Sequence, residues 1–456
     1  MTVTVRCDGW RSLVQCLSFM AIPRVLRLIV AAAGSPRTVF LVAFLVRVAV
    51  AFQLIPGNAD RHFYQPNEPA RIAWNLVSGR GYSSPWPNTV SAPTAQQPPV
   101  YPLLLAGIFR LSGAYSYPSL YIAILLNALF SAITAVLILR LGTRTFGRTV
   151  GVIAALIWSC WIYEVVVSLR LWESALSGML LALGLWWLPE LQDAGSLKWV
   201  RFGVLAGLAA LTNAGLLPVF AGFWLWLWIS RKPGFRGRSF FASVTVCLLV
   251  LLPWTIRNYR ALGRIVPLRD NFGLELWVGN HEGVTHLYDF QGGFPLSNPT
   301  AYNQLGEIAF MEKQRAVAVA FIRQHPGQFL RLCGERLVDF WTSPNPRVWL
   351  PIAVLAWLAI GWAWMRRNRE ATPFAIVLVV FPLVYYVTHT WSTYRHPIEP
   401  EVIVLAVYGT VEIVRRVIPG GWARQGQVNG VPPALGVSTG ESSNSSLKDS
   451  SQTWRS

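Results

Sequence analysis

Residues 118–140 read PSLYIAILLNALFSAITAVLILR, and the first charged side chain in this run is Arg140. About 20 apolar residues are enough for a helix to cross the hydrocarbon core of a membrane. The run therefore predicts a transmembrane helix. Comparable apolar runs occur at 38–56, 149–168, 174–190, 202–217, 218–231, 239–254, 348–365, 373–390 and 398–416. The sequence thus predicts an all-α integral membrane protein with about ten transmembrane helices.

The composition of the whole chain supports this fold class. Of the 456 residues, 53% are hydrophobic and only 13% are charged, whereas soluble domains carry about 25% charged residues. The 22 Trp residues suit a protein with many helix ends at membrane surfaces, where Trp and Tyr side chains collect. A soluble protein is therefore excluded.

The net charge of +18 does not indicate a nucleic-acid partner, because the basic residues cluster in short loops between the apolar runs. Alternating spans put every cluster on one side, and the positive-inside rule makes that side cytoplasmic. The clusters are Arg24, Arg27 and Arg37; Arg140, Arg144 and Arg148; Lys198 and Arg201; Arg231, Lys232, Arg236 and Arg238; Arg366, Arg367 and Arg369; Arg415 and Arg416.

This topology leaves three segments outside the inner (plasma) membrane: 57–117, 255–347 and 388–397. They contain all six His residues of the chain. The predicted division is an interfacial N-terminal segment (1–37), a transmembrane module (38–254, with outer loop 57–117), an extracytoplasmic segment (255–347), C-terminal transmembrane helices (348–416) and a cytoplasmic tail (417–456). The tail is rich in Gly, Ser, Asn, Pro and Gln and is expected to be disordered.

Several classes of site have no sequence signature. The five Cys residues share no spacing typical of disulfides or metal ligands, and no Walker loop or dinucleotide fingerprint is present. The His residues show no helical metal-binding pair. A divalent metal is left open as a cofactor, and no metal-ligating residue is assigned.

A short helix is predicted in the first outer loop. Asn67 is a suitable N-cap and Pro69 fits a first helical turn, while Gly79 and Gly81 end the element. Glu68, Arg71 and Asn75 then share one face because they are three and seven residues apart. Further along, Pro93, Pro98, Pro99 and Pro102 favour an extended return to the membrane.

Two patterns in this loop, IA..L..G.G at 72–81 and PT...PP.YPLLLA at 93–106, resemble the C-type glycosyltransferase (GT-C) superfamily. The resemblance is greatest to bacterial relatives of dolichyl-phosphate-mannose protein mannosyltransferases and lipid A aminoarabinose transferases. It continues through the segments 252–259 (LPWTIRNY), 271–280 (NFGLELWVGN) and 394–400 (YRHPIEP). It covers most of residues 38–416.

The resemblance implies a transferase that moves a sugar from a polyprenyl-phosphate carrier to a lipid, glycan or protein acceptor outside the membrane, usually with inversion. Such a displacement needs a carboxylate base for the acceptor hydroxyl and cations for the departing lipid phosphate. The expected partners are therefore the donor, the acceptor and the bilayer, and no nucleic acid.

In the relatives the base is an Asp about seven residues before the IA pair, a position that holds Gln65 here. Asp60 and Glu68 are the nearest acids, and the sequence does not choose between them. Glu68 could instead be a first-turn acid paired with Arg71, and Asp60 a solvated loop residue. Arg61, His62 and Arg71 are candidate substrate-binding residues beside these acids.

Further candidates lie at other span boundaries. Arg170 and Glu173 either pair with each other or bind the acceptor or a metal. Arg257 and Arg260, and Arg395 with His396, are candidates for the lipid phosphate, with interfacial snorkelling as the alternative. Two other functions stay open: a polytopic lipid or polysaccharide transporter, and a catalytically inactive assembly partner.

Overall fold

The structure is a computed structural model that describes residues 34–58, 68–284, 287–288, 295 and 297–417. These residues form helices joined by turns and loops, with one isolated antiparallel bridge between Ser83 and Pro93. The predicted all-α fold is confirmed. The predicted N-terminal segment and C-terminal tail lie almost entirely outside the described residues.

The α-helices are α3 (Pro36–Asn58), α4 (Glu68–Val77), α5 (Val100–Ser112), α6 (Tyr117–Phe146), α7 (Arg148–Cys160), α8 (Ile162–Ser168), α9 (Ser174–Leu191), α10 (Ser196–Thr212), α11 (Leu216–Ile229), α12 (Gly237–Leu262), α13 (Phe272–Gly279), α14 (Pro299–Leu305), α15 (Glu307–Gln324), α16 (Pro326–Thr342), α17 (Pro346–Met365), α18 (Thr372–Val380), α19 (Leu383–Val387) and α20 (Glu399–Val417). Two 3₁₀ helices, η2 (Arg369–Ala371) and η3 (His396–Ile398), precede α18 and α20.

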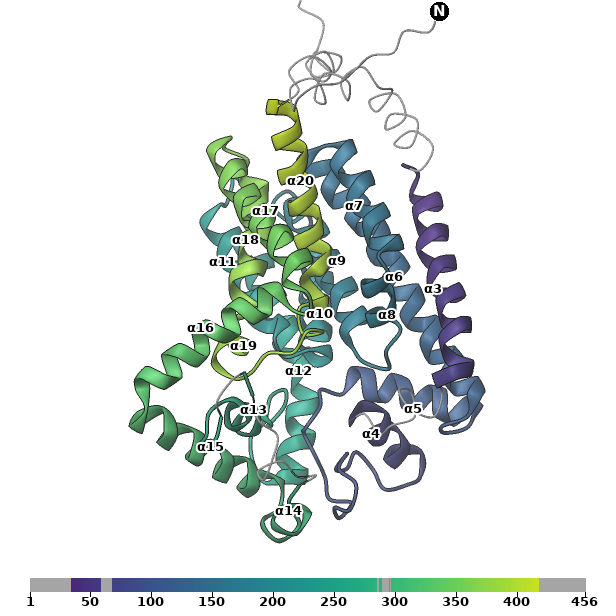
Figure 1. Ribbon diagram of the computed structural model, residues 1–456, viewed down its shortest axis with the longest axis vertical. Helices are drawn as coiled ribbons and strands as arrows, with labels where there is room; N and C mark the ends of the chain where they lie inside the picture. Colours follow the sequence, from purple (N-terminus) through teal and green to yellow (C-terminus); the bar gives the residue numbers. More distant parts are fainter. Residues whose placement is uncertain (1–33, 59–67, 285–286, 289–294, 296, 418–456) are drawn as a thin grey trace, which may run out of the picture.

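Six helical stretches in the described part of the chain are long and apolar enough to span a membrane: α3, α6, α9, α12, α17 and the stretch from η2 to α19. The pair α7 and α8 makes a seventh if the two, bent by 64°, form one span. The shorter helices α10 and α11, and α20 with its acidic residues, lie in the same bundle (Figure 1). The membrane-protein prediction is confirmed, whereas the count of about ten spans is not.

Local sequence signals explain how α6 and α7 begin and end. The side chain of Ser116 accepts a hydrogen bond from the backbone N–H of Ser119 at 3.2 Å, and Pro118 occupies the first turn of α6. Gly147 separates α6 from α7 with φ of 101°, a conformation that L side chains rarely adopt. The long apolar run is therefore closed at both ends by residues suited to those positions.

The basic ends of several helices meet at one end of the bundle. Arg144 of α6 and Lys198 of α10 lie 3.9 and 3.0 Å from the carboxylate of Glu190 in α9. The Asn368 amide, just after α17, donates to the Thr145 carbonyl of α6 at 2.9 Å. These contacts bring the ends of four helices together, as alternating spans require.

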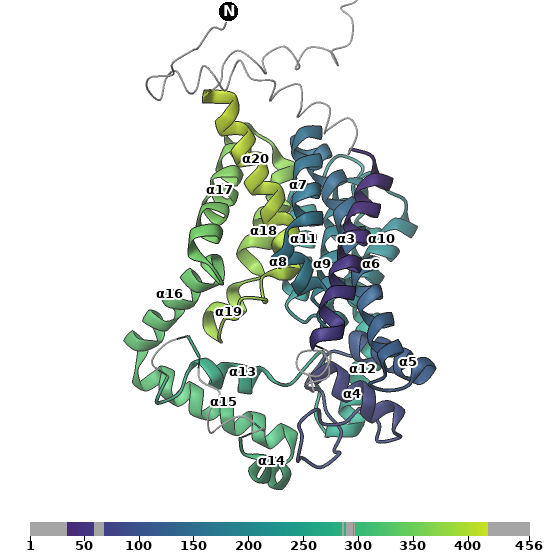
Figure 2. The same ribbon diagram turned by 45° about the vertical axis from the view of Figure 1, so that its right-hand side comes forward.

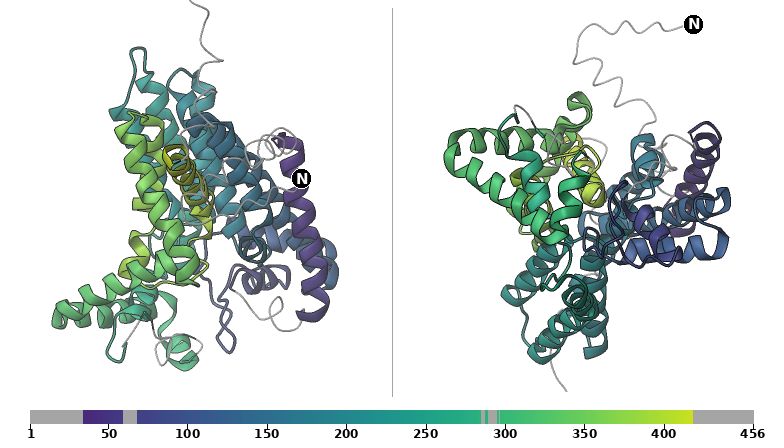
Figure 3. Two further views of the ribbon diagram at one scale, coloured as in Figure 1. Left: turned by 45° about the horizontal axis from the view of Figure 1, so that its top comes forward. Right: turned by 90° about the horizontal axis from the view of Figure 1, so that it is seen from below.

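The opposite end of the bundle carries the elements outside the spans. Figure 1 shows α4, α5, α13, α14 and α15 there, and Figure 2 shows α15 running below α13. Seen from below in Figure 3 (right), the purple and blue segments of α3 to α5 lie on one side and the green α15 and α16 on another. This end therefore gathers segments that are distant in sequence.

A network of buried charges joins the first, the broken and the last helices of the bundle. At the bend between α7 and α8, the Glu164 carboxylate contacts His396 Nδ1 at 2.6 Å. Arg47 of α3, fully buried, donates to the Trp158 carbonyl at 3.1 Å and to Ser168 Oγ at 3.1 Å. A charge in apolar surroundings is costly unless it is paired, so these contacts fix how the helices fit together.

Arg395 extends this network toward α16 and α17. It pairs with Glu399, donates to the carbonyls of Phe340 and Ser343, and lies 4.2 Å from the ring centre of Trp349. All of these groups belong to the junction between α16 and α17 or to the segment that leads into α20. The loop between α19 and α20 is thereby anchored at its C-terminal end.

Helices α10 and α12 approach each other closely, and Gly203 permits this approach. A Cβ atom at Gly203 would overlap the Ser243 carbonyl, whereas the equivalent atom at Gly361 of α17 meets no atom within 4 Å. Small residues allow this kind of close backbone approach between membrane helices.

We predict that Gly203→Ala lowers the free energy of unfolding by about 1–3 kcal/mol, because the added methyl group forces α10 away from α12. Gly361→Ala is the matched control, with an expected change between zero and a gain of about 1 kcal/mol from helix propensity. Unfolding of both variants in the same detergent checks this. Equal stabilities would show that α10 and α12 are not packed this tightly.

Candidate active site

The first outer loop contains the predicted helix, α4, and Glu68 is its first residue. The buried Asn75 amide donates to the carbonyls of Ser83 and Ser84 at 3.3 and 2.9 Å, and Arg80 Nε donates to Asn75 Oδ1 at 3.0 Å. Asn75 therefore holds the chain that follows α4 against the helix, which fixes Glu68 at the other end of α4.

The proline-containing segment 93–102 connects α4 to other parts of the molecule. Gln97 Nε2 donates to the Glu68 carboxylate. The Tyr101 hydroxyl accepts from Asn127 Nδ2 at 2.9 Å, and the same amide group donates to the Arg170 carbonyl at 2.6 Å. The segment thus links Glu68 to the turn between α8 and α9, which carries Glu173.

A second set of contacts fixes this segment to α15. The buried Glu307 carboxylate accepts from the Thr94 hydroxyl, from the Ala95 backbone N–H at 2.6 Å and from the Tyr302 hydroxyl at 2.7 Å. Three donors satisfy one buried carboxylate, which is the condition for keeping such a group in a protein interior. Glu307 therefore fixes the segment 93–102 to α15, and we assign it a structural role.

One guanidinium interacts electrostatically with three carboxylates in the candidate site. Arg269 Nη2 lies 3.4 Å from Glu275 Oε1. Its charge also acts on Glu68 and Glu173, and lowers the pKa of each. The four side chains come from α4, the turn before α9, the loop after α12, and α13. We call them the acidic cluster.

Burial dominates the electrostatics of the acidic cluster. Loss of solvent raises the pKa of Glu68 to about 7, against the opposing effect of Arg269, and Glu275 raises it further. Burial raises the pKa of Glu173 to about 7 as well, with a smaller increase from the nearby Glu68. A carboxylate whose pKa lies near the working pH is suited to general base catalysis.

Two atoms of the acidic cluster lack a hydrogen-bond partner among the described residues, although both are buried. They are Arg269 Nε and Glu173 Oε2. Buried polar atoms in folded proteins are nearly always hydrogen-bonded, so a donor and an acceptor without partners in one cluster are available to a polar ligand. The arrangement offers one cationic donor and one acceptor to that ligand.

A histidine and a tyrosine from the loop 388–398 complete one wall of the site. His389 Nδ1 lies 3.5 Å from Glu275 Oε2, and His389 Nε2 lies 3.0 Å from the Tyr394 hydroxyl. Burial lowers the pKa of His389 to about 4, so the ring is neutral at pH 7. A proton on Nδ1 directed at Glu275 leaves Nε2 to accept from Tyr394, which satisfies both contacts.

Arg336 of α16 holds this wall in place. The buried guanidinium donates to the Gly279 carbonyl at the end of α13, to Asn280 Oδ1 at 3.2 Å, and to the Val387 carbonyl at the end of α19 at 3.1 Å. One side chain thereby joins α13, which carries Glu275, to the beginning of the loop that carries His389.

The sequence-derived candidates divide into three groups. Asp60, Arg61 and His62 lie outside the described residues. Glu68 and Glu173 are brought together in the acidic cluster. The others lie elsewhere: Arg71 is 5.7 Å from the ring centre of Trp74, and Arg170 and Arg260 are exposed.

Two pairings considered at the sequence level do not occur. Within the described part of the chain, no ion pair joins Glu68 to Arg71 or Arg170 to Glu173. Glu68 is instead bonded by Gln97, and Glu173 is buried while Arg170 is exposed. The acids turn toward Arg269 because that guanidinium lies inside the site, whereas the neighbours in sequence do not.

Three of the four candidates for the lipid phosphate are occupied by protein groups. Arg257 donates to the carbonyls of Tyr82 and Thr94 at 2.6 Å each, which fixes the first outer loop to α12. Arg395 and His396 belong to the buried network described above. We therefore assign Arg257 and Arg395 a structural role, because these donors already have partners; His396 is bound to Glu164 through Nδ1, while its buried Nε2 has no hydrogen-bond partner among the described residues.

The described residues contain no group of three His, Cys, Asp or Glu side chains with the geometry of a metal site. Of the histidines, His281 stacks on Trp277 with ring centres 4.0 Å apart, and His325 lies 3.7 Å from the Glu282 carboxylate. No residue is assigned to a metal.

Sequence reasoning missed Arg269, Glu275, His389 and Tyr394 as site residues. Glu275 and Tyr394 lie in segments quoted for the family resemblance, and Arg269 stands beside Asp270 in a loop between helices. The location of Glu275 and Tyr394 in these segments could have identified both as site candidates. Their convergence depends on α13 and the loop 388–398 folding toward α4, which no local pattern encodes.

A family model matches part of the chain. Residues 96–256 match the family model described as dolichyl-phosphate-mannose-protein mannosyltransferase. The search of curated proteins found no match.

Among solved structures, the chain is similar to ArnT from Cupriavidus metallidurans. The crystal structure bound to undecaprenyl phosphate has 17% sequence identity and a TM-score of 0.47, and the apo structure has 16% and 0.44. Each alignment covers 83% of this chain and 61% of the ArnT chain. The family match in residues 96–256 confirms the resemblance to dolichyl-phosphate-mannose protein mannosyltransferases that the sequence predicts.

Proposed function

We propose that this protein transfers a sugar from a polyprenyl-phosphate carrier to an acceptor hydroxyl. The observation that carries the proposal is the acidic cluster, in which the pKa values of Glu68 and Glu173 are raised to about 7 beside Arg269. The matched family region, 96–256, contains Glu173 and the segment that bonds Glu68. The description of that family names a dolichyl-phosphate sugar, which supports the donor class.

In the proposed reaction the acceptor oxygen attacks the anomeric carbon of the donor. The bond from that carbon to the phosphate oxygen breaks, and its electron pair leaves with the lipid phosphate. The acceptor proton passes to Glu68, whose pKa near 7 suits a general base at neutral pH. A single displacement of this kind inverts the anomeric configuration.

Arg269 is our candidate for stabilising the departing phosphate. Its Nε–H has no partner among the described residues, and a guanidinium binds phosphate oxygens through charge-assisted hydrogen bonds. The charge that develops on the phosphate is met by a donor already in place, which is the main way that enzymes stabilise such transition states.

The basic helix ends support a topology for this reaction. The positive-inside rule makes their side cytoplasmic, so the acidic cluster, at the other end of the bundle, faces outward. We propose an inner-membrane protein with an extracytoplasmic active site and a cytoplasmic C-terminal tail.

We predict that Glu68→Gln lowers turnover by about 10²–10⁴-fold, the usual contribution of a general base, while the protein stays folded. Release of free polyprenyl phosphate from radiolabelled polyprenyl-phosphate sugars, with a membrane extract as acceptor source, measures this. Asp60→Asn is the comparison: if it abolishes turnover and Glu68→Gln does not, Asp60 is the base. Folded wild-type protein that turns over no donor would favour the transporter or the inactive partner.

We predict that kcat/KM rises with pH up to about 7 and then levels off, because Glu68 must be ionised to accept the proton. Glu68 and Glu173 interact, so the observed midpoint belongs to the pair. In Glu173→Gln the midpoint should move down, since the neighbouring negative charge is gone. A midpoint near 4.5 in the wild type would contradict the burial of these groups.

We predict opposite consequences for two arginines. Arg269→Gln should lower kcat by about 10²–10³-fold and move the pH midpoint up, because Arg269 lowers the pKa of Glu68. Arg257→Gln should instead lower the unfolding free energy by about 2 kcal/mol or more, since two carbonyls lose a charged donor. Stability and turnover measured on both variants separate the roles; a stable, inactive Arg257→Gln would return Arg257 to the phosphate site.

A further inference from the structure

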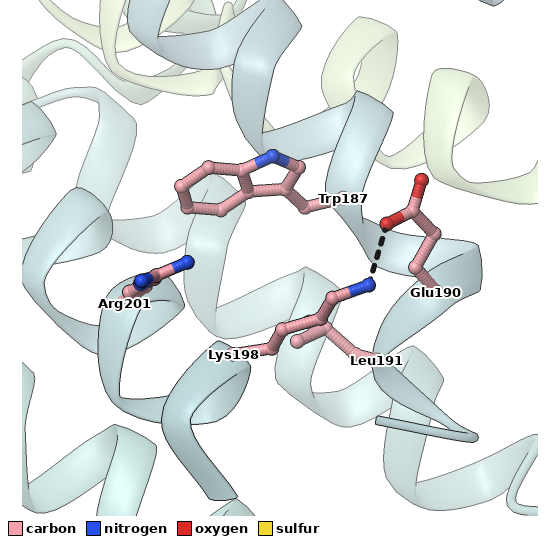
Figure 4. Close-up of a pocket in the computed structure, with 5 residues that line it drawn as sticks. All are labelled: Trp187, Glu190, Leu191, Lys198 and Arg201. Atoms are coloured by element: carbon pink, nitrogen blue, oxygen red, sulfur yellow. Dashed lines mark hydrogen bonds and ion pairs between the residues drawn. The ribbon is translucent and has the colours of Figure 1, made fainter. Parts of the chain in front are cut away.

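A hollow lies between α9 and α10, at the end of the bundle away from the acidic cluster. Trp187, Glu190 and Leu191 line it from α9, and Lys198 and Arg201 from α10 (Figure 4). The hollow is partly open to solvent and has a volume of about 90 Å³.

The charges around the hollow are unequal. Glu190 is the one acid in the lining, and two cations neutralise it: Lys198 Nζ at 3.0 Å and Arg144 Nη1 at 3.9 Å. Arg201 is a third cation, exposed, and it has no hydrogen bond or ion pair with any described residue. In Figure 4 its guanidinium lies across the hollow from the Lys198–Glu190 pair, below Trp187. The site therefore presents an excess of positive charge with one unoccupied guanidinium.

The surroundings place the hollow at the level of lipid headgroups. Arg144 and Arg140 lie 4.5 and 5.7 Å from the ring centre of Trp186, and Trp side chains mark the membrane–water interface. Val204 and Leu208, which follow Arg201 along α10 toward the middle of the bundle, are 37% and 39% exposed and are suited to contact lipid. An anionic lipid whose phosphate reaches Arg201 keeps its acyl chains in the apolar region beside these two side chains.

We propose that this hollow binds the phosphate of an anionic phospholipid on the membrane face opposite the acidic cluster. Basic pockets between transmembrane helices recognise such headgroups, and a guanidinium can hold two phosphate oxygens at once. Topogenic charge alone does not account for the arrangement, because the positive-inside rule needs basic residues on one side but not a hollow with an unpaired cation. The proposal is independent of the transferase reaction.

Native mass spectrometry of the purified full-length protein, with phosphatidylglycerol and phosphatidylcholine of the same acyl chains, tests the proposal. We expect Arg201→Gln to weaken phosphatidylglycerol binding about tenfold, as expected for loss of charged hydrogen bonds, and to leave phosphatidylcholine binding unchanged. Arg238→Gln is the matched control: it removes an exposed positive charge from the first turn of α12, outside the hollow. This control should bind like the wild type.

Two further measurements separate a lipid site from a site for a free anion. Arg201→Lys keeps the charge but not the two-pronged donor, and we expect binding between wild type and Arg201→Gln. Inorganic phosphate, added in excess, should not displace phosphatidylglycerol if the acyl chains contribute. Equal binding by Arg201→Gln and Arg238→Gln, or full displacement by inorganic phosphate, would overturn the proposal, the second result indicating a site for a free anion.

Discussion

A charge buried among apolar helices must find its partner inside the bundle, as Glu164 does at His396. The bend between α7 and α8 exposes backbone carbonyls and directs Glu164 inward, where His396 reaches it. Arg47 takes up the carbonyl of Trp158 beside the bend. Because removing one partner leaves an uncompensated charge, α3, the broken helix and the start of α20 are held in one arrangement.

That arrangement positions the active-site wall. The segment that begins α20 is fixed by His396 and Arg395, so the loop before it has one anchored end, and Arg336 holds the chain just before it. Between these anchors lie His389 and Tyr394. On the other side of the site, the segment 93–102 is tied to α4, α6, α12 and α15 at once. These contacts therefore fix the positions of the candidate site residues, although most of these residues belong to loops.

The two ends of the bundle differ in chemistry. One end holds carboxylates near a single guanidinium, and burial raises the pKa of two of them to about 7. The other end gathers arginine and lysine around few acids, with tryptophan rings at the same level. The first arrangement suits proton transfer next to a leaving phosphate, and the second suits contact with an anionic membrane surface.

The sequence alone determined the fold class, the positions of the long apolar helices, and α4, because hydropathy and capping are local properties, but it did not fix the number of spans or α5. Its patterns also made Asp60, Glu68 and Glu173 candidates without choosing between Asp60 and Glu68. Only the tertiary structure decided which cations were free. Arg257, Arg395 and His396 look like phosphate ligands in sequence, but they bond to carbonyls or a carboxylate supplied by distant segments. Arg269 acquires its role because α4, α9 and α13 meet around it, and the partner of a buried charge depends on packing rather than on its neighbours in the chain.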